Sequence, residues 1–105
     1  MYYVYILRCA GNTLYTGIAA DIGRRMGEHF GQTEKCAKYT RSHRAESLEA
    51  LWTAADRSLA SKLEYRIKQL TKAQKLRLIA EEGTFEETTG FSAEDYRRED
   101  VSGIL

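Results

Sequence analysis

The sequence predicts an α+β domain whose elements follow in the order β-β-α-β-α-α. Two observations lead to this prediction: three short segments are rich in β-branched and aromatic residues, and three further stretches begin at residues that cap helices. With 105 residues, 43% of them hydrophobic and 30% charged, the chain has the composition of one globular domain with one modest core.

The first two strands are predicted at residues 2–7, "YYVYIL", and 13–18, "TLYTGI", as a hairpin. A three-residue loop at 10–12 pairs Tyr5 with Gly17 and places Tyr5 and Tyr15 on one face of the sheet. A two-residue turn at 11–12 places these tyrosines on opposite faces, and both turns are physically reasonable. A glycine opposite Tyr5 is expected to leave space for a ligand to approach the backbone.

The remaining elements are predicted from caps and periodicity. Asp21 caps a helix to about Phe30, which has an apolar stripe of Ile22, Met26 and Phe30. The segment "SLEALWT" at 47–53 is the third strand. Asp56 caps a second helix, and "TKAQ" at 71–74 has the capping-box pattern for a third helix ending near residue 82. The stripe of the second helix consists of Leu59, Leu63, Ile67 and Leu70.

Composition limits the class of protein. The apolar N-terminus alternates and is too short for a membrane span, and no basic region precedes it. Cys9 and Cys36 lack the spacing of a metal site and are expected to be reduced thiols in a cytoplasmic protein. We therefore expect a cytoplasmic location and no membrane partner.

Charge is divided unevenly along the chain. Residues 1–82 carry 14 Lys and Arg against 9 Asp and Glu, whereas residues 83–105 carry 2 against 6. The first part, 1–82, is expected to form the domain and suits a polyanionic partner. The segment 83–105 is expected to be an acidic tail, loosely docked or disordered, which could compete for the basic surface.

Three side chains lie at the borders of predicted apolar stripes. Arg25 and His29 share one edge of the first helix, where a guanidinium could grip a phosphate or could simply cover apolar surface with its stem. Glu64 lies at the border of the second helix. Its carboxylate could hold a divalent cation such as Mg²⁺, or could form an ion pair with Lys68.

The stretch 31–45 shows no periodicity and is expected to be a long basic loop. Basic residues interleaved with an aromatic residue could bind a nucleic-acid backbone and stack on a base. The alternative is a loop that is basic for solubility alone. The residues concerned are Lys35, Lys38, Tyr39, Arg41, His43 and Arg44.

Taken together, these residues resemble a known family. Tyr5 within "VYI", the "YTG" at 15–17, Arg25 ten residues after Tyr15, and the later Glu64 are similar to the motifs of the GIY-YIG nucleases, in particular the small single-domain bacterial YhbQ-like subgroup. The stretches "LYTGIAADIGRR", "AKYTR" and "DRSLASKLEYRIKQLTKAQK" carry the likeness to this subgroup. The resemblance covers roughly residues 2–82 and implies a three-stranded antiparallel sheet flanked by helices.

The resemblance also implies roles for individual residues. Tyr5, Tyr15, Arg25 and Glu64 would be catalytic, with Glu64 the ligand of one Mg²⁺ or Mn²⁺ ion. One tyrosine would orient or deprotonate the attacking water, and the other would position phosphate or water. The substrate would be bound by Gly17, His29, Lys38, Tyr39 and Arg41.

The first half-motif departs from the family because it reads Val4-Tyr5-Ile6 and retains only the tyrosine. In addition, Ile18 stands where some members carry a basic residue. The predicted function is a metal-dependent DNA endonuclease, of low activity if the missing basic residue matters, that acts in DNA repair or processing. Such an enzyme is expected either to recognise DNA structure rather than sequence or to depend on a protein partner for targeting. The alternatives are a non-catalytic nucleic-acid-binding module and a protein-interaction domain.

Overall fold

The sheet of the computed structural model has four strands in the order β2-β1-β3-β4, with antiparallel pairing between all neighbours. The prediction of an α+β fold is confirmed, but the prediction of three strands is wrong. The fourth strand is formed by two residues, Arg97 and Arg98, which pair with Thr53 and Trp52. Two consecutive arginines have no strand propensity, so only their tertiary pairing reveals this strand.

The structure describes residues 1–32 and 34–102. Their elements, in chain order, are β1 (Tyr2–Cys9), β2 (Thr13–Ala19), α1 (Ile22–Phe30), α2 (Lys38–Ser42), β3 (Ala45–Ala54), α3 (Arg57–Lys68), α4 (Lys72–Ala80), η1 (Glu82–Thr84), α5 (Phe85–Thr89) and β4 (Arg97–Arg98).

The predicted helix starts are confirmed by their caps. The Asp21 carboxylate accepts a hydrogen bond from the backbone N–H of Arg24, and the Asp56 carboxylate accepts one from Leu59. Thr71 and Gln74 form the expected reciprocal capping box at the start of α4. The predicted loop at 31–45 differs, because a short helix, α2, forms within it.

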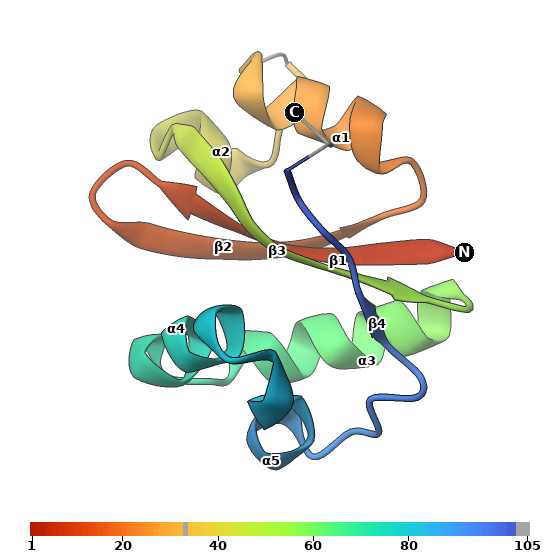
Figure 1. Cartoon of the computed structure of the whole chain (residues 1–105). Helices are drawn as coiled ribbons and strands as arrows, with labels where there is room; N and C mark the ends of the chain where they lie inside the picture. The colour runs from red at the N-terminus through yellow and green to blue at the C-terminus, as the bar shows by residue number, and fades with distance from the viewer. Residues whose placement is uncertain (33, 103–105) are drawn as a thin grey trace.

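The sheet lies between two layers of helices (Figure 1). Helices α1 and α2 cover one face, and α3, α4 and α5 cover the other. Strand β1 supplies alternate side chains to both layers, as the period of a strand requires. Tyr5 and Leu7 pack toward α1, whereas Val4 and Ile6 pack with Leu63 and other residues of α3. Strand β2 is the open edge of the sheet, beside both layers.

The acidic C-terminal segment is packed, so the prediction of a loosely docked tail is wrong for the part of 83–105 that the structure describes, up to residue 102. Phe85 and Tyr96 are buried and join the core on the α3 face. The Tyr96 hydroxyl donates to the Leu59 carbonyl at 2.6 Å. Aromatic side chains spaced along a charged segment give no helical or strand period, which is why the sequence did not reveal this packing.

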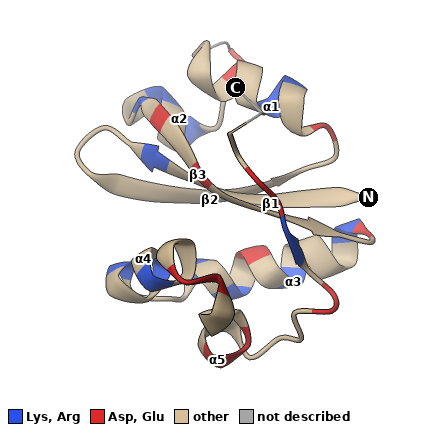
Figure 2. Ribbon diagram, in the orientation of Figure 1, with Lys and Arg blue, Asp and Glu red and all other residues tan. Residues whose placement is uncertain are grey.

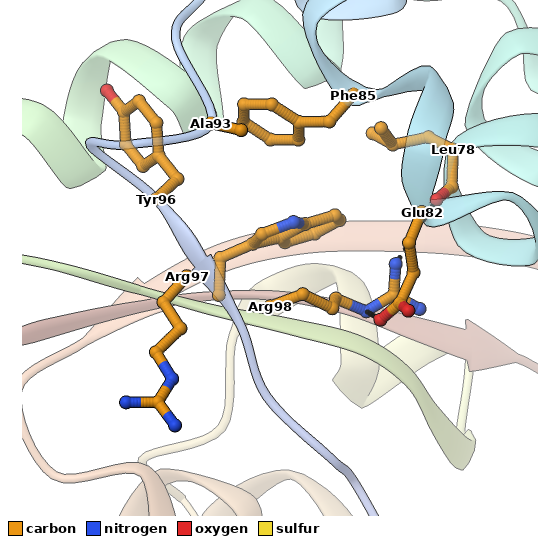
Figure 3. A pocket seen from close by; sticks show the side chains of 8 residues that line it. Leu78, Glu82, Phe85, Ala93, Tyr96, Arg97 and Arg98 are labelled. Carbon is orange, nitrogen blue, oxygen red and sulfur yellow. Dashed lines mark hydrogen bonds and ion pairs between the residues drawn. The ribbon is translucent and has the colours of Figure 1, made fainter.

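Figure 3 shows the cavity where this segment meets the sheet. The cavity has a volume of about 250 Å³ and is lined by Trp52, Phe85 and Tyr96 among others. The Arg98 guanidinium lies 5.2 Å from the centre of the Trp52 ring and donates to the Ile79 carbonyl at 2.9 Å, near the end of α4. Strand β4 therefore fastens the C-terminal segment to both β3 and α4.

Charged residues occur in all layers of the fold (Figure 2). Basic residues gather on α1, α2 and α4, and acidic residues gather along η1 and α5. Among the described residues, no helix has both the length and the apolarity that crossing a membrane requires.

Candidate active site

The hairpin register brings two tyrosines to one face of the sheet. Leu7 pairs with Tyr15 and Tyr5 pairs with Gly17, which confirms the three-residue loop and excludes the two-residue alternative. Gly11 and Asn12 have φ angles of 82° and 58°, so this turn needs residues that tolerate the left-handed region. The rings of Tyr5 and Tyr15 are 6.4 Å apart between centroids.

Gly17 is required because the phenol of Tyr5 lies directly over it. A Cβ atom at position 17 would be 2.5 Å from the Tyr5 Oη and 2.7 Å from its Cζ, closer than atoms can approach. The expected space above Gly17 is thus filled by the Tyr5 side chain rather than left for a ligand. The spacing of the "YTG" motif follows from this contact, since the glycine must stand opposite Tyr5.

A buried chain of hydrogen bonds leads away from Tyr5. Its Oη is 2.7 Å from His29 Nε2, and His29 Nδ1 is 2.8 Å from the Oγ1 of Thr40. The Thr40 hydroxyl donates in turn to the Ala37 carbonyl at 3.1 Å. Tyr5, His29 and Thr40 are each at most 1% exposed. The position of His29 in the helix suggested that it lies at the border of the apolar stripe. The structure instead places its side chain inside the protein.

The environment holds both Tyr5 and His29 in their neutral forms. Burial raises the pKa of Tyr5 well above its ordinary value, although the nearby Arg25 opposes this rise. Burial, and to a smaller extent the positive charge of Arg25, together lower the pKa of His29 to about 4. At neutral pH the pair is therefore a phenol beside an uncharged imidazole.

Arg25 is held at the rim of this buried group. Its Nη1 donates to Glu28 Oε1 and to the Lys35 carbonyl, both at 2.7 Å, and its side chain is 25% exposed. Arg24 points into solvent, with 67% of its side chain exposed. A hollow of about 300 Å³, lined by both arginines and by Ile18 among others, lies beside Arg25. A guanidinium that is oriented on one side and open on the other is suited to binding an anion.

Glu64 lies on α3, in the helical layer on the other side of the sheet (Figure 1). Its Oε2 is 3.4 Å from Lys68 Nζ, so the ion pair considered from the sequence is present. Its side chain is 23% exposed, and its negative charge contributes to the raised pKa of Tyr5. Among the described residues no hydrogen bond or ion pair joins it to Tyr5, Tyr15 or Arg25, although its charge acts on the phenol of Tyr5.

The donor set can be tested for a metal ion. Within residues 1–32 and 34–102, no three His, Cys, Asp or Glu side chains gather closely enough to form a metal site. A single carboxylate at Glu64 nevertheless fits Mg²⁺, which is often bound by one or two carboxylates and keeps several waters while it takes up substrate phosphate oxygens. The residues present thus suit a metal bound together with a substrate.

Aromatic rings continue from the two tyrosines to α2. Tyr39 stacks on Tyr15 with ring centroids 5.5 Å apart, and on His43 at 4.4 Å with an interplanar angle of 12°. A hollow of about 340 Å³ lies beside them, lined by Lys38, Tyr39, Ser42 and His43. Arg41 is exposed and donates to the Glu34 carbonyl at 2.9 Å. Lys38, Tyr39 and Arg41 thus lie on the same short helix next to Tyr15.

The structure therefore brings together Tyr5, Tyr15, Gly17, Arg25 and His29, with Tyr39 adjacent, and it leaves Glu64 in the opposite layer. Thr40 is the residue that the sequence analysis missed. Its stretch has no periodicity, and a threonine beside Lys38, Tyr39 and Arg41 carries no sign of burial. The only available signal was a buried His29, which would have required a partner for its second ring nitrogen.

Comparison with known proteins agrees with these motifs. The family model described as the GIY-YIG catalytic domain matches residues 1–77. The UPF0213 protein Ent638_3592 of Enterobacter sp. (strain 638) is 53% identical over 85 residues, which cover 81% of each chain. The UPF0213 protein YhbQ of Salmonella typhimurium is 49% identical over 85 residues, covering 81% of this chain and 83% of that protein.

Among solved structures, the UPF0213 protein BH0048 from Bacillus halodurans, determined by solution NMR, is 37% identical in sequence. The match covers 88% of this chain and 98% of that chain, with a TM-score of 0.48.

Proposed function

The chain belongs to the GIY-YIG catalytic-domain family, whose members are nucleases, and we propose that it is a metal-dependent endonuclease that hydrolyses phosphodiester bonds in DNA. One observation carries the proposal. The phenol of Tyr5 lies across Gly17, is hydrogen-bonded to a neutral His29, and stands beside Arg25, whose side chain is 25% exposed. The motif residues thus form one connected polar group, buried at Tyr5 and His29, that reaches the surface at Arg25.

The chemistry of phosphodiester hydrolysis assigns a task to each group. Arg25 is oriented by Glu28 and the Lys35 carbonyl, and its free side is available for the charge that develops on the phosphate oxygens. Tyr5 and Tyr15 lie on the same face, where their hydroxyl groups can orient a water molecule or a phosphate. Lys38, Tyr39 and Arg41 extend this surface along α2 and would bind the flanking nucleic acid.

Glu64 would hold the divalent ion, Mg²⁺ or Mn²⁺. When bound, such an ion neutralises charge on the phosphate and lowers the pKa of a coordinated water. Glu64 projects from α3, whereas the tyrosines project toward α1, and β2 is the edge strand beside both layers. A substrate strand that crosses the β2 edge would therefore meet the arginine and the carboxylate from opposite sides.

The cellular role follows from the same proposal. A single domain without further DNA-reading domains among its described residues suits an enzyme of DNA repair or processing that recognises DNA structure or depends on a protein partner for targeting. We propose that it acts in the cytoplasm, because Cys9 and Cys36 are free and buried.

The test is incubation of the full-length protein with plasmid, nicked, flapped and single-stranded DNA, in Mg²⁺ or in EDTA. Cleavage that requires the metal and is lost in Arg25→Ala and Glu64→Ala is the expected result. Arg97→Ala is the control, since Arg97 lies on β4 and 84% of its side chain is exposed. Salt-sensitive binding without cleavage, unaffected by Glu64→Ala, would instead identify a non-catalytic binding module.

A further inference from the structure

The hydrogen-bond chain from Tyr5 to Thr40 has a fixed direction. Thr40 Oγ1 carries one hydrogen, and this hydrogen is donated to the Ala37 carbonyl, which can only accept. With its hydrogen directed to Ala37, the threonine oxygen accepts from His29, and this arrangement places the imidazole proton on Nδ1. The chain thus begins at a backbone carbonyl whose role cannot be reversed.

The same reasoning extends to Tyr5. A neutral imidazole carries one N–H, and Thr40 places it on Nδ1, so His29 Nε2 presents a lone pair. The contact of 2.7 Å between Nε2 and Tyr5 Oη then requires the tyrosine hydroxyl to donate. Its hydrogen points into the protein. Of the oxygen lone pairs, one faces Arg25, whose hydrogen bond to the phenol opposes the rise in the pKa of Tyr5, and one remains.

We propose that Thr40 is a positioning residue that fixes His29 in the Nδ1–H tautomer, so that Tyr5 donates inward and offers its remaining oxygen lone pair, beside Arg25, to a water or substrate group in the site. This inference rests on the proposed nuclease function. It goes beyond that function by assigning Tyr5 the task of accepting a hydrogen bond from the attacking water while retaining its own proton.

The electrostatics of the pair support this task. Proton transfer from Tyr5 to His29 would create a phenolate and an imidazolium inside the protein. Burial raises the pKa of the first group and lowers that of the second, so both changes oppose the transfer. Tyr5 is consequently better suited to orienting water than to removing a proton from it.

The direct test is the tautomer of His29 in the full-length protein, read from long-range ¹H–¹⁵N correlations of its imidazole ring. The chain has only two histidines, so His43→Gln assigns the signals. A pyrrole-like Nδ1 and a pyridine-like Nε2 are expected at neutral pH. The opposite tautomer, or a protonated ring, would overturn the proposal without any variant of Thr40 being needed.

Two variants connect the tautomer to activity. Thr40→Ser retains the hydroxyl and should keep the Nδ1–H tautomer and cleave within about threefold of wild type. Thr40→Val removes the acceptor; it should shift the tautomer toward Nε2–H and lower kcat by roughly 10- to 100-fold with little change in KM, the range seen for partners that orient catalytic ligands. A cleavage rate for Thr40→Val equal to that of wild type would overturn the proposal.

The outcomes distinguish the positioning role of Thr40 from the proposed nuclease function. If wild-type protein cleaves DNA but Thr40→Val changes neither the tautomer nor the rate, the positioning role fails and the nuclease function stands. If no DNA is cleaved by wild type under any condition, the nuclease function fails and the role of Thr40 in it fails with it, whatever tautomer is observed. Thermal unfolding of both variants identifies a loss of activity that is due only to loss of folded protein.

Discussion

Strand β1 sends alternate side chains to the two faces of one sheet, and these faces bury groups of different character. Toward α3 it sends Val4 and Ile6, which pack with apolar and aromatic residues contributed as far along the chain as Tyr96. Toward α1 it sends Tyr5, which is equally buried but ends in a hydroxyl bonded to His29. The apolar face tolerates rearrangement, whereas a buried polar chain is stable only when every group has its partner.

The difference teaches where stability and chemistry reside in this small domain. The α3 face is held by area removed from water, which is not directional. The α1 face is held by hydrogen bonds, which depend on the distance and direction between donor and acceptor. A displacement of about a few tenths of an ångström therefore weakens it. Substitutions on each face can test whether stability depends mainly on the α3 face and catalysis on the α1 face.

The largest effect is expected on the apolar face, at Phe85. Its ring is buried between Trp52 and Tyr96, with centroids at 6.1 and 5.7 Å. Phe85→Ala should lower the free energy of unfolding by about 3–5 kcal/mol, measured by urea denaturation of the full chain. Glu87→Ala, on the same short helix but with 69% of its side chain exposed, is the control and should change stability by less than about 0.5 kcal/mol. Equal effects would show that the C-terminal segment is not part of the core.

The second prediction concerns the polar face, at Gly17. A methyl group there would displace the Tyr5 phenol, which lies 2.5 Å from the position of the new Cβ atom. Gly17→Ala should therefore reduce DNA cleavage on the order of 100-fold, since misplacement by about 1 Å of a catalytic group has this cost. Gly27→Ala is the matched control, because no atom lies within 4 Å of a Cβ there and alanine favours the helix. Wild-type cleavage by Gly17→Ala would contradict the assigned position of Tyr5.

The third prediction uses pH to separate the faces. The pKa of His29 is lowered to about 4 in the folded protein, chiefly by burial, from its ordinary value of 6.5. Between these values the unfolded chain binds a proton that the folded chain does not. Stability should therefore be complete above pH 6.5 and fall by about 2–3 kcal/mol as the pH decreases toward 4.

The comparison that isolates this contribution is the stability difference between wild type and His29→Gln, measured by denaturation at several pH values. Other groups titrate in both proteins and cancel in the difference. The difference should shrink as the pH decreases from 6.5 to 4. A difference that is constant over this range would show that His29 is accessible to protons in the folded state.

Local patterns predicted those parts of the molecule that depend on residues near in sequence. The caps at Asp21, Asp56 and Thr71 and the strand alternation of the hairpin are of this kind, and the structure confirms them. The choice between two hairpin registers could not be made, because both turns were compatible with Gly11 and Asn12. The pairing of Tyr5 with Gly17 required the structure.

The missed features all depend on contacts between distant segments. Strand β4 exists only because Arg98 pairs with Trp52, 46 positions earlier in the chain, and gains carbonyl partners at the end of α4. Thr40 acquires its role only because α2 packs over His29. The role of Glu64 in the site was implied by the family resemblance and stays a prediction, since its position on a stripe does not reveal which face of the sheet its helix covers.

The smallest effect is expected on the outer surface of the apolar layer, where α3 meets α4. Lys72 Nζ donates to the Asn12 carbonyl in the hairpin turn, and the pKa of Lys75 is lowered by burial and by the nearby charge of Lys68. A phosphate would stabilise the neighbouring ammonium groups of Lys68 and Lys75. The surface where α3 meets α4 is therefore expected to contact the DNA backbone beyond Glu64. Lys75→Gln should weaken DNA binding by a few-fold and reduce the slope of log K against log salt by about 0.7–0.9, the value for one lost phosphate contact. Lys62→Gln, an exposed lysine elsewhere on α3, should leave the slope closer to that of wild type. If both variants leave the slope unchanged, the DNA contacts only the α1 and α2 side, and the apolar layer serves stability alone.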